Sequence, residues 1–271
     1  MRAIALRARL LLVGDPYQLP PIGFGLVFHI LAASQTVPRV ELVEVHRQAQ
    51  TSGIPQSAYQ VRHGVVPPLP PFAGVHAGVS FVDATNENVI ERMLSVRAEW
   101  SGYRDMQILS VTKRGASGTR NINATLHARA STGRRKLDRW ELAEGDPIIY
   151  MANDYQKELW NGSLGWIEKI LGSNGRQSLL CCLDGVRHEV HEEDFHRVEL
   201  AYAITVHKSQ GSQFNRVIVP VFESRLLDRT LIYTAMTRGV EQVVFIGDRK
   251  AFDAAVTASP RSHERQVGFS I

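Results

Sequence analysis

Three short segments of the sequence concentrate polar side chains directly after apolar runs. The first, Gly14–Gly23, follows the run Arg9–Val13 and holds an aspartate and a glutamine between prolines and glycines. We expect Asp15 and Gln18 to emerge at the carboxyl end of a buried strand, where open α/β sheets bind their ligands. These two side chains could orient a water molecule or a phosphate, or the segment could be a simple turn after a strand.

The second segment, around Thr205–Gln213, and the third, Tyr233–Gly239, lie closer to the C-terminus. From Thr205 to Gln213, seven of nine residues are polar, and their hydroxyl, imidazole, ammonium and amide groups suit phosphate and sugar oxygens, although a plain surface loop has the same composition. Arg238 ends an expected helix, where an arginine either complements the helix dipole or presents a cation to a transferring phosphoryl group. Arg47, which follows the apolar run Val40–Val45, leaves the same two alternatives open.

Apolar runs and amphipathic segments alternate along the chain, and this alternation predicts the elements that position those residues. Buried strands are expected at Arg9–Val13, Val40–Val45, Met106–Val111, Val217–Val221 and Val243–Ile246. Helices are expected at Glu87–Trp100, Gly118–Ala130 and Leu231–Arg238. Strands that alternate with helices indicate an α/β fold with helices packed on a largely parallel sheet.

Two stretches interrupt the alternation. The segment His63–Gly78 contains four prolines and is expected to be an extended connector. Residues 131–197 contain short β-like pieces at Pro147–Met151, Gly165–Leu171, Gln177–Leu183 and Arg187–His191. Asn161-Gly162 and Asp184-Gly185 separate some of these pieces, and such pairs favour hairpin turns because both residues accept positive φ. We therefore expect a small antiparallel barrel inserted into the α/β domain.

The composition narrows the class of protein. A chain of 271 residues with 44% hydrophobic and 21% charged residues can form a globular core, and no apolar run is long enough for a membrane span. The net charge of +4 permits a polyanionic partner without requiring one. The adjacent Cys181 and Cys182 offer neither a disulfide framework nor zinc-ligand spacing, so we expect a reducing, cytoplasmic compartment and no metal site on this chain.

Taken together, the segments resemble motifs of the RecD-like helicases of superfamily 1, in order and in spacing as well as in residue type. Gly14–Gly23 is similar to motif III, Leu42–Gln48 to motif IV, Tyr202–Phe214 to motif V and Ile232–Gly239 to motif VI. Leu109–Asn123 is similar to the family segment that bears a threonine and paired glycines. The resemblance extends over nearly the whole chain, to about Phe252.

This resemblance implies a fold and a domain organisation. The fold would be a RecA-like parallel-sheet motor domain of the P-loop NTPase type, with a small SH3-like β-barrel inserted into it. Residues 1–38 would be an edge of the first motor domain, and residues 39–130 together with 198–271 would form the second motor domain. Residues 131–197 would form the inserted barrel.

The resemblance also implies roles for individual residues. Gln18 would sense the γ-phosphate and couple it to DNA, while Arg47 and Arg238 would stabilise charge on the transferring phosphate. The residues implied to approach the nucleotide are Gly14, Asp15, Gly211 and Gln213, although the family usually has glutamate at the position of Gln213. Those implied to contact the DNA strand are Thr112, Lys113, Thr205, His207 and Lys208.

Two family elements are missing from the sequence. It contains no G-x-x-x-x-G-K-[ST] pattern and no Asp-Glu pair after an apolar strand, so the phosphate-binding lysine and the magnesium ligands are expected on another half. The resemblance thus implies the C-terminal part of an ATP-dependent, 5′-to-3′ DNA helicase that uses ATP and Mg²⁺. Its expected partners are single-stranded DNA and a P-loop-bearing half or other helicase subunits. The alternatives are a non-enzymatic nucleic-acid-binding module and an unrelated phosphate-binding α/β protein.

Overall fold

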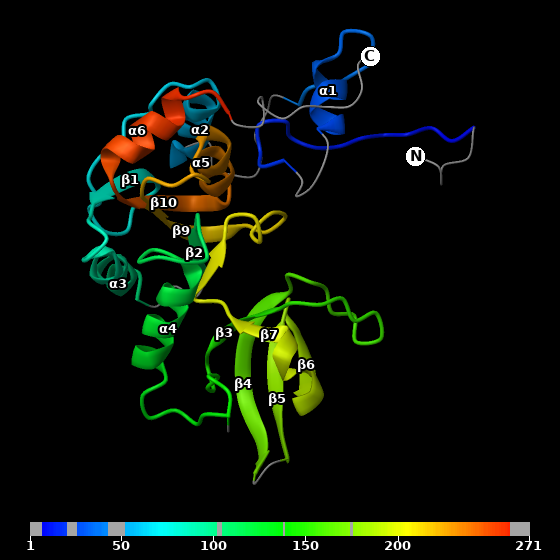
Figure 1. The fold of residues 1–271 in the computed structure, drawn as a ribbon, viewed down its shortest axis with the longest axis vertical. Coiled ribbons are helices and arrows are strands. Elements are labelled where there is room, and N and C mark those ends of the chain that lie inside the picture. The colour runs from blue at the N-terminus through cyan, green and yellow to red at the C-terminus, as the bar shows by residue number, and fades with distance from the viewer. Residues whose placement is uncertain are drawn as a thin grey trace.

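Two sheets organise the chain. The computed structural model describes residues 7–20, 26–42, 52–101, 105–137, 139–173 and 176–260. Within these ranges one five-stranded sheet is parallel and a second five-stranded sheet is antiparallel. Figure 1 shows the parallel sheet with its helices in the upper part of the molecule and the antiparallel sheet below it.

The parallel sheet has the strand order β1-β10-β9-β2-β8. Its strands are β1 (Gly78–Asp83), β2 (Met106–Ser110), β8 (Ala203–Thr205), β9 (Phe214–Val221) and β10 (Gly239–Gly247). All four strand pairs run parallel. The α/β architecture expected from the alternation of apolar runs and amphipathic segments is therefore confirmed.

Helices cover both faces of the parallel sheet (Figure 1). The helices α2 (Ile54–Arg62), α5 (Arg229–Met236) and α6 (Arg249–Thr257) share one apolar cluster with the sheet, and α3 (Val89–Glu99) and α4 (Thr119–Ala130) share the other. Along β10, Val243 and Phe245 enter the first cluster, whereas Val244 and Ile246 enter the second. Both faces of the strand are buried, which explains its continuous apolar run.

The antiparallel sheet has the order β6-β5-β4-β3-β7 and a separate apolar cluster. Its strands are β3 (Pro147–Tyr150), β4 (Leu164–Ser173), β5 (Arg176–Leu183), β6 (Val186–His191) and β7 (Val198–Leu200), with a short 3₁₀ helix, η2 (Glu192–Arg197), before β7. Asp184 and Gly185 have φ of 49° and 82°, the positive values that a tight hairpin turn needs. Cys181 and Cys182 on β5 are buried free thiols.

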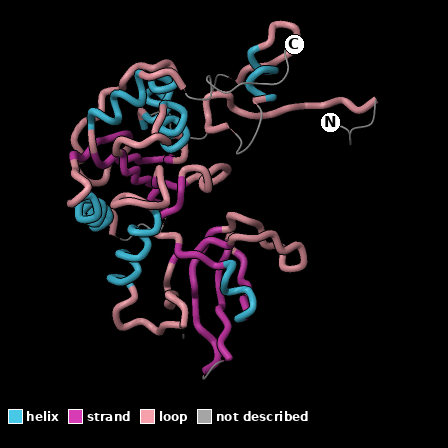
Figure 2. Tube along the Cα trace, in the orientation of Figure 1, coloured by secondary structure: helices cyan, strands magenta, loops and turns pink. Residues whose placement is uncertain are grey.

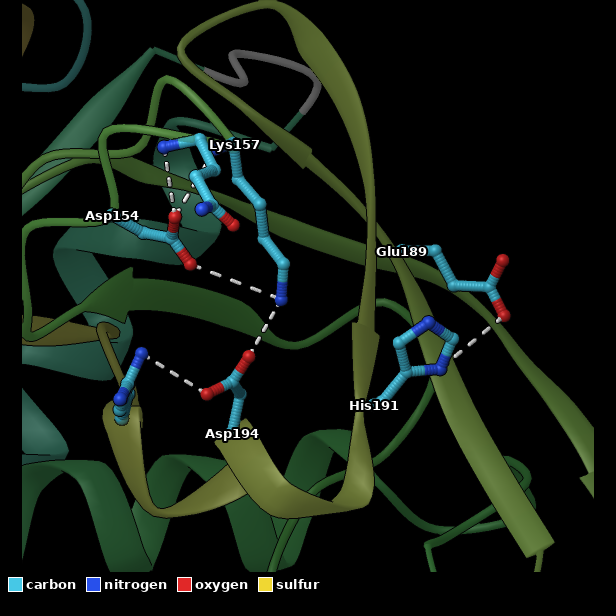
Figure 3. A network of polar contacts seen from close by, with 7 residues as sticks. Asp154, Lys157, Glu189, His191 and Asp194 are labelled. Carbon is cyan, nitrogen blue, oxygen red and sulfur yellow. Dashed lines mark hydrogen bonds and ion pairs between the residues drawn. The ribbon is translucent and has the colours of Figure 1, made fainter.

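The loop between β3 and β4 is fixed to η2 by a network of charged side chains (Figure 3). Lys157 Nζ lies 2.6 Å from Asp194 Oδ2 and 3.9 Å from Asp154 Oδ2, and Arg197 Nη1 lies 3.1 Å from Asp194 Oδ1. The hydrogen bond from Lys157 holds the pKa of Asp194 below its ordinary value. This network stabilises the end of the antiparallel sheet from which the loop extends.

A buried carboxylate joins the two sheets. Asp146, just before β3, is fully buried and lies with Oδ2 2.9 Å from His127 Nδ1 on α4. Tyr202, just before β8, donates its hydroxyl proton to Asp146 Oδ1 at 2.8 Å, and the Ala143 amide donates to Oδ2 at 2.7 Å. Burial raises the pKa of the Tyr202 hydroxyl. The network holds α4 and β8 against the antiparallel sheet.

Two expectations about the first third of the chain differ from the structure. The predicted strand Arg9–Val13 is wrong: these residues form no strand, and Leu11 and Val13 are 85% and 87% exposed. An apolar run becomes a buried strand only when neighbouring strands flank it, and none of the described strands pairs with this one. Of the expected strand Val40–Val45, residues 40–42 are irregular and exposed, and the rest lies outside the described residues.

The connector preceding the sheet shows a third difference. The proline-containing segment is irregular as expected, but Gly78 already begins β1, which the sequence pattern did not reveal. Before it, α1 (Val27–Ala33) is a short helix without a buried residue. Of the helices in the described ranges, none has the length and apolar character that a bilayer crossing requires.

Candidate functional site

Residues from three distant parts of the sequence meet where β9 and β10 begin. Arg238 follows α5, and its carbonyl oxygen accepts a hydrogen bond from the Phe214 amide at the start of β9. Asp15 and Gln18 lie against the same place, although more than 200 residues separate them from Arg238. We call Asp15, Gln18, Tyr233 and Arg238 the arginine cluster.

The Arg238 guanidinium is buried, and its nitrogens donate hydrogen bonds to oxygen atoms of the chain. Only 4% of the residue is exposed. Nη2 donates to Gln18 Oε1 at 3.1 Å, Nη1 donates to the Ser212 carbonyl at 3.1 Å, and Nε donates to the Thr234 carbonyl at 3.3 Å. Because the guanidinium fork has fixed geometry, these contacts set the direction in which its charge is presented.

The Asp15 carboxylate connects the first segment to α5. Its oxygens accept hydrogen bonds from the Tyr17 amide at 2.9 Å, from Gln18 Nε2 at 3.1 Å and from the Tyr233 hydroxyl at 2.9 Å. Burial raises the pKa of that hydroxyl, and the negative charge of Asp15 adds to the rise. Leu19 completes the attachment, since its amide donates to Thr234 Oγ1 at 2.8 Å.

A pocket of about 410 Å³ opens where the two sheets meet. It is lined on one side by α4 and the end of β8 and on the other by β3 and β7. Three of the residues expected to contact DNA, Lys113, Thr205 and Lys208, line it together. Lys113 follows β2, Thr205 ends the neighbouring strand β8 and Lys208 follows it, so the carboxyl ends of these parallel strands bring the three residues to one edge. We call this cavity the interface pocket.

Lys208 is held in place at the rim of the pocket. Its Nζ lies 3.0 Å from Glu199 Oε2 and 3.0 Å from Met151 Sδ, and its amide donates to Thr205 Oγ1 at 3.3 Å. Lys113 is exposed. A cation fixed beside a hydroxyl, with a second cation nearby, can contact successive phosphates of a nucleic acid backbone.

The remaining predicted residues lie around these two places. Thr112 is not among the residues lining the pocket, and its hydroxyl donates to the Arg114 carbonyl at 2.8 Å. His207 is half-buried at the start of loop 206–213, while Gly211 and Gln213 are exposed near its end. Gly211 has φ of +91°, which favours glycine. Gly14 is exposed, and Arg47 lies outside the described residues.

Sequence reasoning missed several residues that these sites use. Tyr233 lies inside the predicted motif VI, yet only the structure pairs it with Asp15. Gln210 lies inside motif V, and its Nε2 donates to the Leu19 carbonyl at 2.9 Å. Both could have been found as polar residues within the motifs. Asp146 and Trp140 lie between α4 and β3, where no pattern distinguished them from surface residues.

Comparisons with known proteins find similar proteins for these segments. Residues 200–246 match the UvrD-like helicase C-terminal domain, and residues 1–77 match an AAA domain. The chain is 31% identical over 259 residues to an ATP-dependent RecD2 DNA helicase from Deinococcus radiodurans, covering 94% of this chain and 35% of the relative. It is 30% identical to the RecBCD enzyme subunit RecD from Mycolicibacterium smegmatis, covering 94% of this chain and 48% of that subunit.

The chain is similar to RecD-like helicases of superfamily 1 over nearly its whole length. It spans less than half the length of either of these two relatives. The UvrD-like match includes the whole of both segments that resemble motifs V and VI, which supply Thr205, Lys208 and Arg238.

A solved structure supports the fold assignment. A Pif1 helicase from Bacteroides, crystallised with ADP-AlF3 and single-stranded DNA, superposes with a TM-score of 0.54 over 93% of this chain and 64% of the Pif1 chain. The two sequences are 17% identical, so this likeness concerns the fold alone. Together with the parallel sheet, it supports the RecA-like assignment.

Proposed function

We propose that this RecD-like chain is the C-terminal part of an ATP-dependent DNA helicase. It binds single-stranded DNA and supplies Arg238, together with Arg47, to an ATP site whose P-loop lies on another half. The observation that carries the proposal is the hydrogen bond between Arg238 Nη2 and Gln18 Oε1, which joins two predicted phosphate-facing residues 220 positions apart.

In this hydrogen bond, Gln18 Oε1 takes the position that a phosphate oxygen would occupy as the acceptor for Arg238. Gln18 Oε1 is a neutral acceptor, whereas a γ-phosphate oxygen carries charge and forms hydrogen bonds roughly twice as strong with a guanidinium. A nucleotide brought up by a P-loop half would thus compete for Nη2 and release the Gln18 amide. Through this exchange Gln18 would sense the γ-phosphate.

The residues present fit the phosphate end of ATP better than its magnesium ion. Arg238 offers a cation, and Gly14 and Gly211 leave backbone exposed nearby. Asp15 is the carboxylate of the arginine cluster, and its oxygens already accept three hydrogen bonds. Magnesium ligands are therefore expected on the P-loop half, while Gln213 and Gly211 would approach the nucleotide or its ribose. When bound, ATP would supply the phosphoryl group whose transfer drives movement on DNA.

The interface pocket is the proposed single-strand contact. Lys113 and Lys208 would face the phosphates, and Thr205 would donate its hydroxyl proton to a phosphate oxygen. His207 and Thr112 would extend the contact at its edges. The pocket lies between the two sheets, so a strand bound there would touch both of them.

The proposed domain organisation follows the family pattern. Residues 1–38 would be an edge of the first motor domain, residues 39–130 with 198–271 the second motor domain, and residues 131–197 an inserted SH3-like barrel. The separate apolar cluster of the antiparallel sheet supports the insertion. Strand β7, which follows residue 197, pairs with β3 and continues that sheet.

The decisive experiment joins the chain to a P-loop-bearing first motor domain from a RecD-like relative and measures DNA-stimulated ATP hydrolysis. Arg238→Ala should lower kcat by about 10³- to 10⁵-fold, because the variant lacks the cation that stabilises charge on the transferring phosphate. Arg238→Lys should recover little, since lysine lacks the planar fork. The chain alone should not hydrolyse ATP.

The matched control is Arg249→Ala, which removes a half-exposed arginine paired with Asp253 on α6. It should leave kcat unchanged. DNA binding of the Arg238 variants should stay close to that of the parent. Thermal unfolding is measured alongside kcat, because Arg238→Ala leaves the Ser212 and Thr234 carbonyls without this donor and should lower stability. If Arg238→Ala keeps kcat within tenfold of the parent, the motif VI assignment is wrong and the chain is better described as a non-enzymatic nucleic-acid-binding module.

A further inference from the structure

One wall of the interface pocket is an aromatic side chain that no motif accounts for. Trp140 lines the cavity together with Lys113, Thr205 and Lys208. The residue is 37% exposed, whereas Trp100 is completely buried. Trp140 lies between α4 and β3 in the chain, and Figure 2 shows the segment that connects these two elements as a loop.

The backbone around Trp140 is held by hydrogen bonds, although the described residues of this segment form no helix or long strand. The Leu137 amide donates to the Leu142 carbonyl at 2.9 Å, and Lys136 and Ala143 form an antiparallel bridge, so the segment is a narrow hairpin. Leu137 and Leu142 are 3% and 4% exposed and pack into the core of the antiparallel sheet. The hairpin legs are thus anchored, and Trp140 lies near the tip.

The indole ring itself is supported from one side. Its centroid lies 5.7 Å from that of Phe195, a fully buried residue of η2, with the ring planes at 82°. Edge-to-face packing of this kind fixes the ring orientation. An aromatic ring that is oriented before binding loses little conformational entropy when a flat partner stacks on it.

The charges around the pocket favour a polyanion that carries flat groups. Lys113, Arg120 and Lys208 contribute three cations, and Glu141 and Glu199 contribute two carboxylates. Lys208 pairs with Glu199, whereas Lys113 and Arg120 pair with no acid among the residues that the structure describes. Cations beside an exposed aromatic ring are the combination with which proteins bind single strands without reading their sequence.

We propose that Trp140 is a base-stacking residue, on which one nucleobase of single-stranded DNA stacks while Lys113, Thr205 and Lys208 contact its backbone. This inference rests on the proposed function, since it requires the strand to enter the interface pocket. It adds a contact from the inserted antiparallel sheet. The inserted sheet therefore takes part directly in holding the strand.

The test measures the affinity of the 271-residue chain for two fluorescent oligonucleotides of equal length, oligo-dT and a fully abasic strand with the same phosphates. Trp140→Ala should weaken binding to oligo-dT about 5- to 150-fold, because stacking of one base is lost. It should leave binding to the abasic strand unchanged. Trp140→Phe should retain most of the affinity for oligo-dT.

The matched control is Trp160→Ala, which removes a tryptophan that is 50% exposed and is not among the residues lining the pocket. It should bind both strands as the parent does, and thermal unfolding of all variants checks that they remain folded. Equal weakening of both strands by Trp140→Ala, or no weakening of either, overturns the stacking proposal while DNA binding stands. Absence of binding by the parent chain contradicts the proposed function as well.

Discussion

The arginine cluster and the interface pocket draw on successive parts of the same loop, residues 206–213, yet they present their charges differently. In the arginine cluster, Arg238 is 4% exposed and its donors are directed at oxygens of Gln18, Ser212 and Thr234. In the pocket, Lys113 is exposed and the cavity is open. The donors of Arg238 in the arginine cluster are therefore occupied by acceptors of the chain itself, whereas Lys113 in the interface pocket is available to a ligand.

Under the proposed function, this difference predicts an order of events. A DNA strand would contact the pocket without breaking a side-chain hydrogen bond of Lys113, whereas a phosphate would have to displace Gln18 to reach Nη2 of Arg238. Loop 206–213 connects the two, since Lys208 at its start lines the pocket and the Ser212 carbonyl near its end accepts from Arg238. Movement of this loop is thus the expected route by which DNA binding and phosphate binding influence each other.

The largest expected effect on stability comes from the carboxylate that holds the pocket walls together. Asp146→Ala should lower the free energy of unfolding by about 3–5 kcal/mol, because Tyr202, His127 and the Ala143 amide lose a buried partner. Urea denaturation measures this change. If the two sheets rely on Asp146, DNA affinity should fall along with stability.

An exposed aspartate supplies the control for that experiment. Asp105→Ala, just before β2, should change stability by no more than about 0.5 kcal/mol. A similarly small loss for Asp146→Ala would mean that the sheets are held by apolar packing alone. Asp146 would then not be the residue that keeps the walls of the interface pocket in place.

A smaller effect is expected in the arginine cluster. Tyr233→Phe removes the hydroxyl that donates to Asp15 and should cost about 1.5–3 kcal/mol, since the acceptor is charged. The pKa of Tyr233 is raised in the folded chain, so its contribution is complete below about pH 10 and is lost as the pH rises and the unfolded tyrosine ionises first. Stability of Tyr233→Phe should therefore decline less above pH 10.

Denaturation of both proteins between pH 8 and pH 11 checks this prediction. Tyr59→Phe is a suitable comparison, because Tyr59 is 59% exposed on α2. Parallel declines of Tyr233→Phe and parent would show that the Asp15–Tyr233 hydrogen bond contributes nothing to the attachment of the first segment.

The sequence predicted local elements well where they are buried on both faces or end in strong turns. The strands near Val217–Val221 and Val243–Ile246 and the hairpin at Asp184-Gly185 lie where expected. The apolar run Arg9–Val13 failed as a strand because strand formation depends on neighbours that a local pattern does not contain. Strand β1 was missed because its first residues follow a proline-rich connector.

Many residues of the candidate sites could be predicted from the sequence, but their arrangement in space could not. Asp15, Gln18 and Arg238 were chosen for their types and motif context, and the structure brings them together. Lys113, Thr205 and Lys208 likewise line one pocket. The proposed role of Trp140 and the contacts of Asp146 depend on how the antiparallel sheet packs against α4, which no periodicity in the sequence encodes.

The central claim is that the interface pocket of this chain is a DNA-binding surface whose cations are available to the strand. The salt dependence of binding to oligo-dT tests this claim most directly. Affinity should fall linearly on a log–log scale as salt rises, because each phosphate contact releases counterions with a slope of about 0.7. Lys113→Ala combined with Lys208→Ala should reduce that slope by about 1.4, twice the value for one contact. Lys250→Ala, on α6, should leave it unchanged. No binding at low salt, or a slope unaffected by the double substitution, would contradict the account.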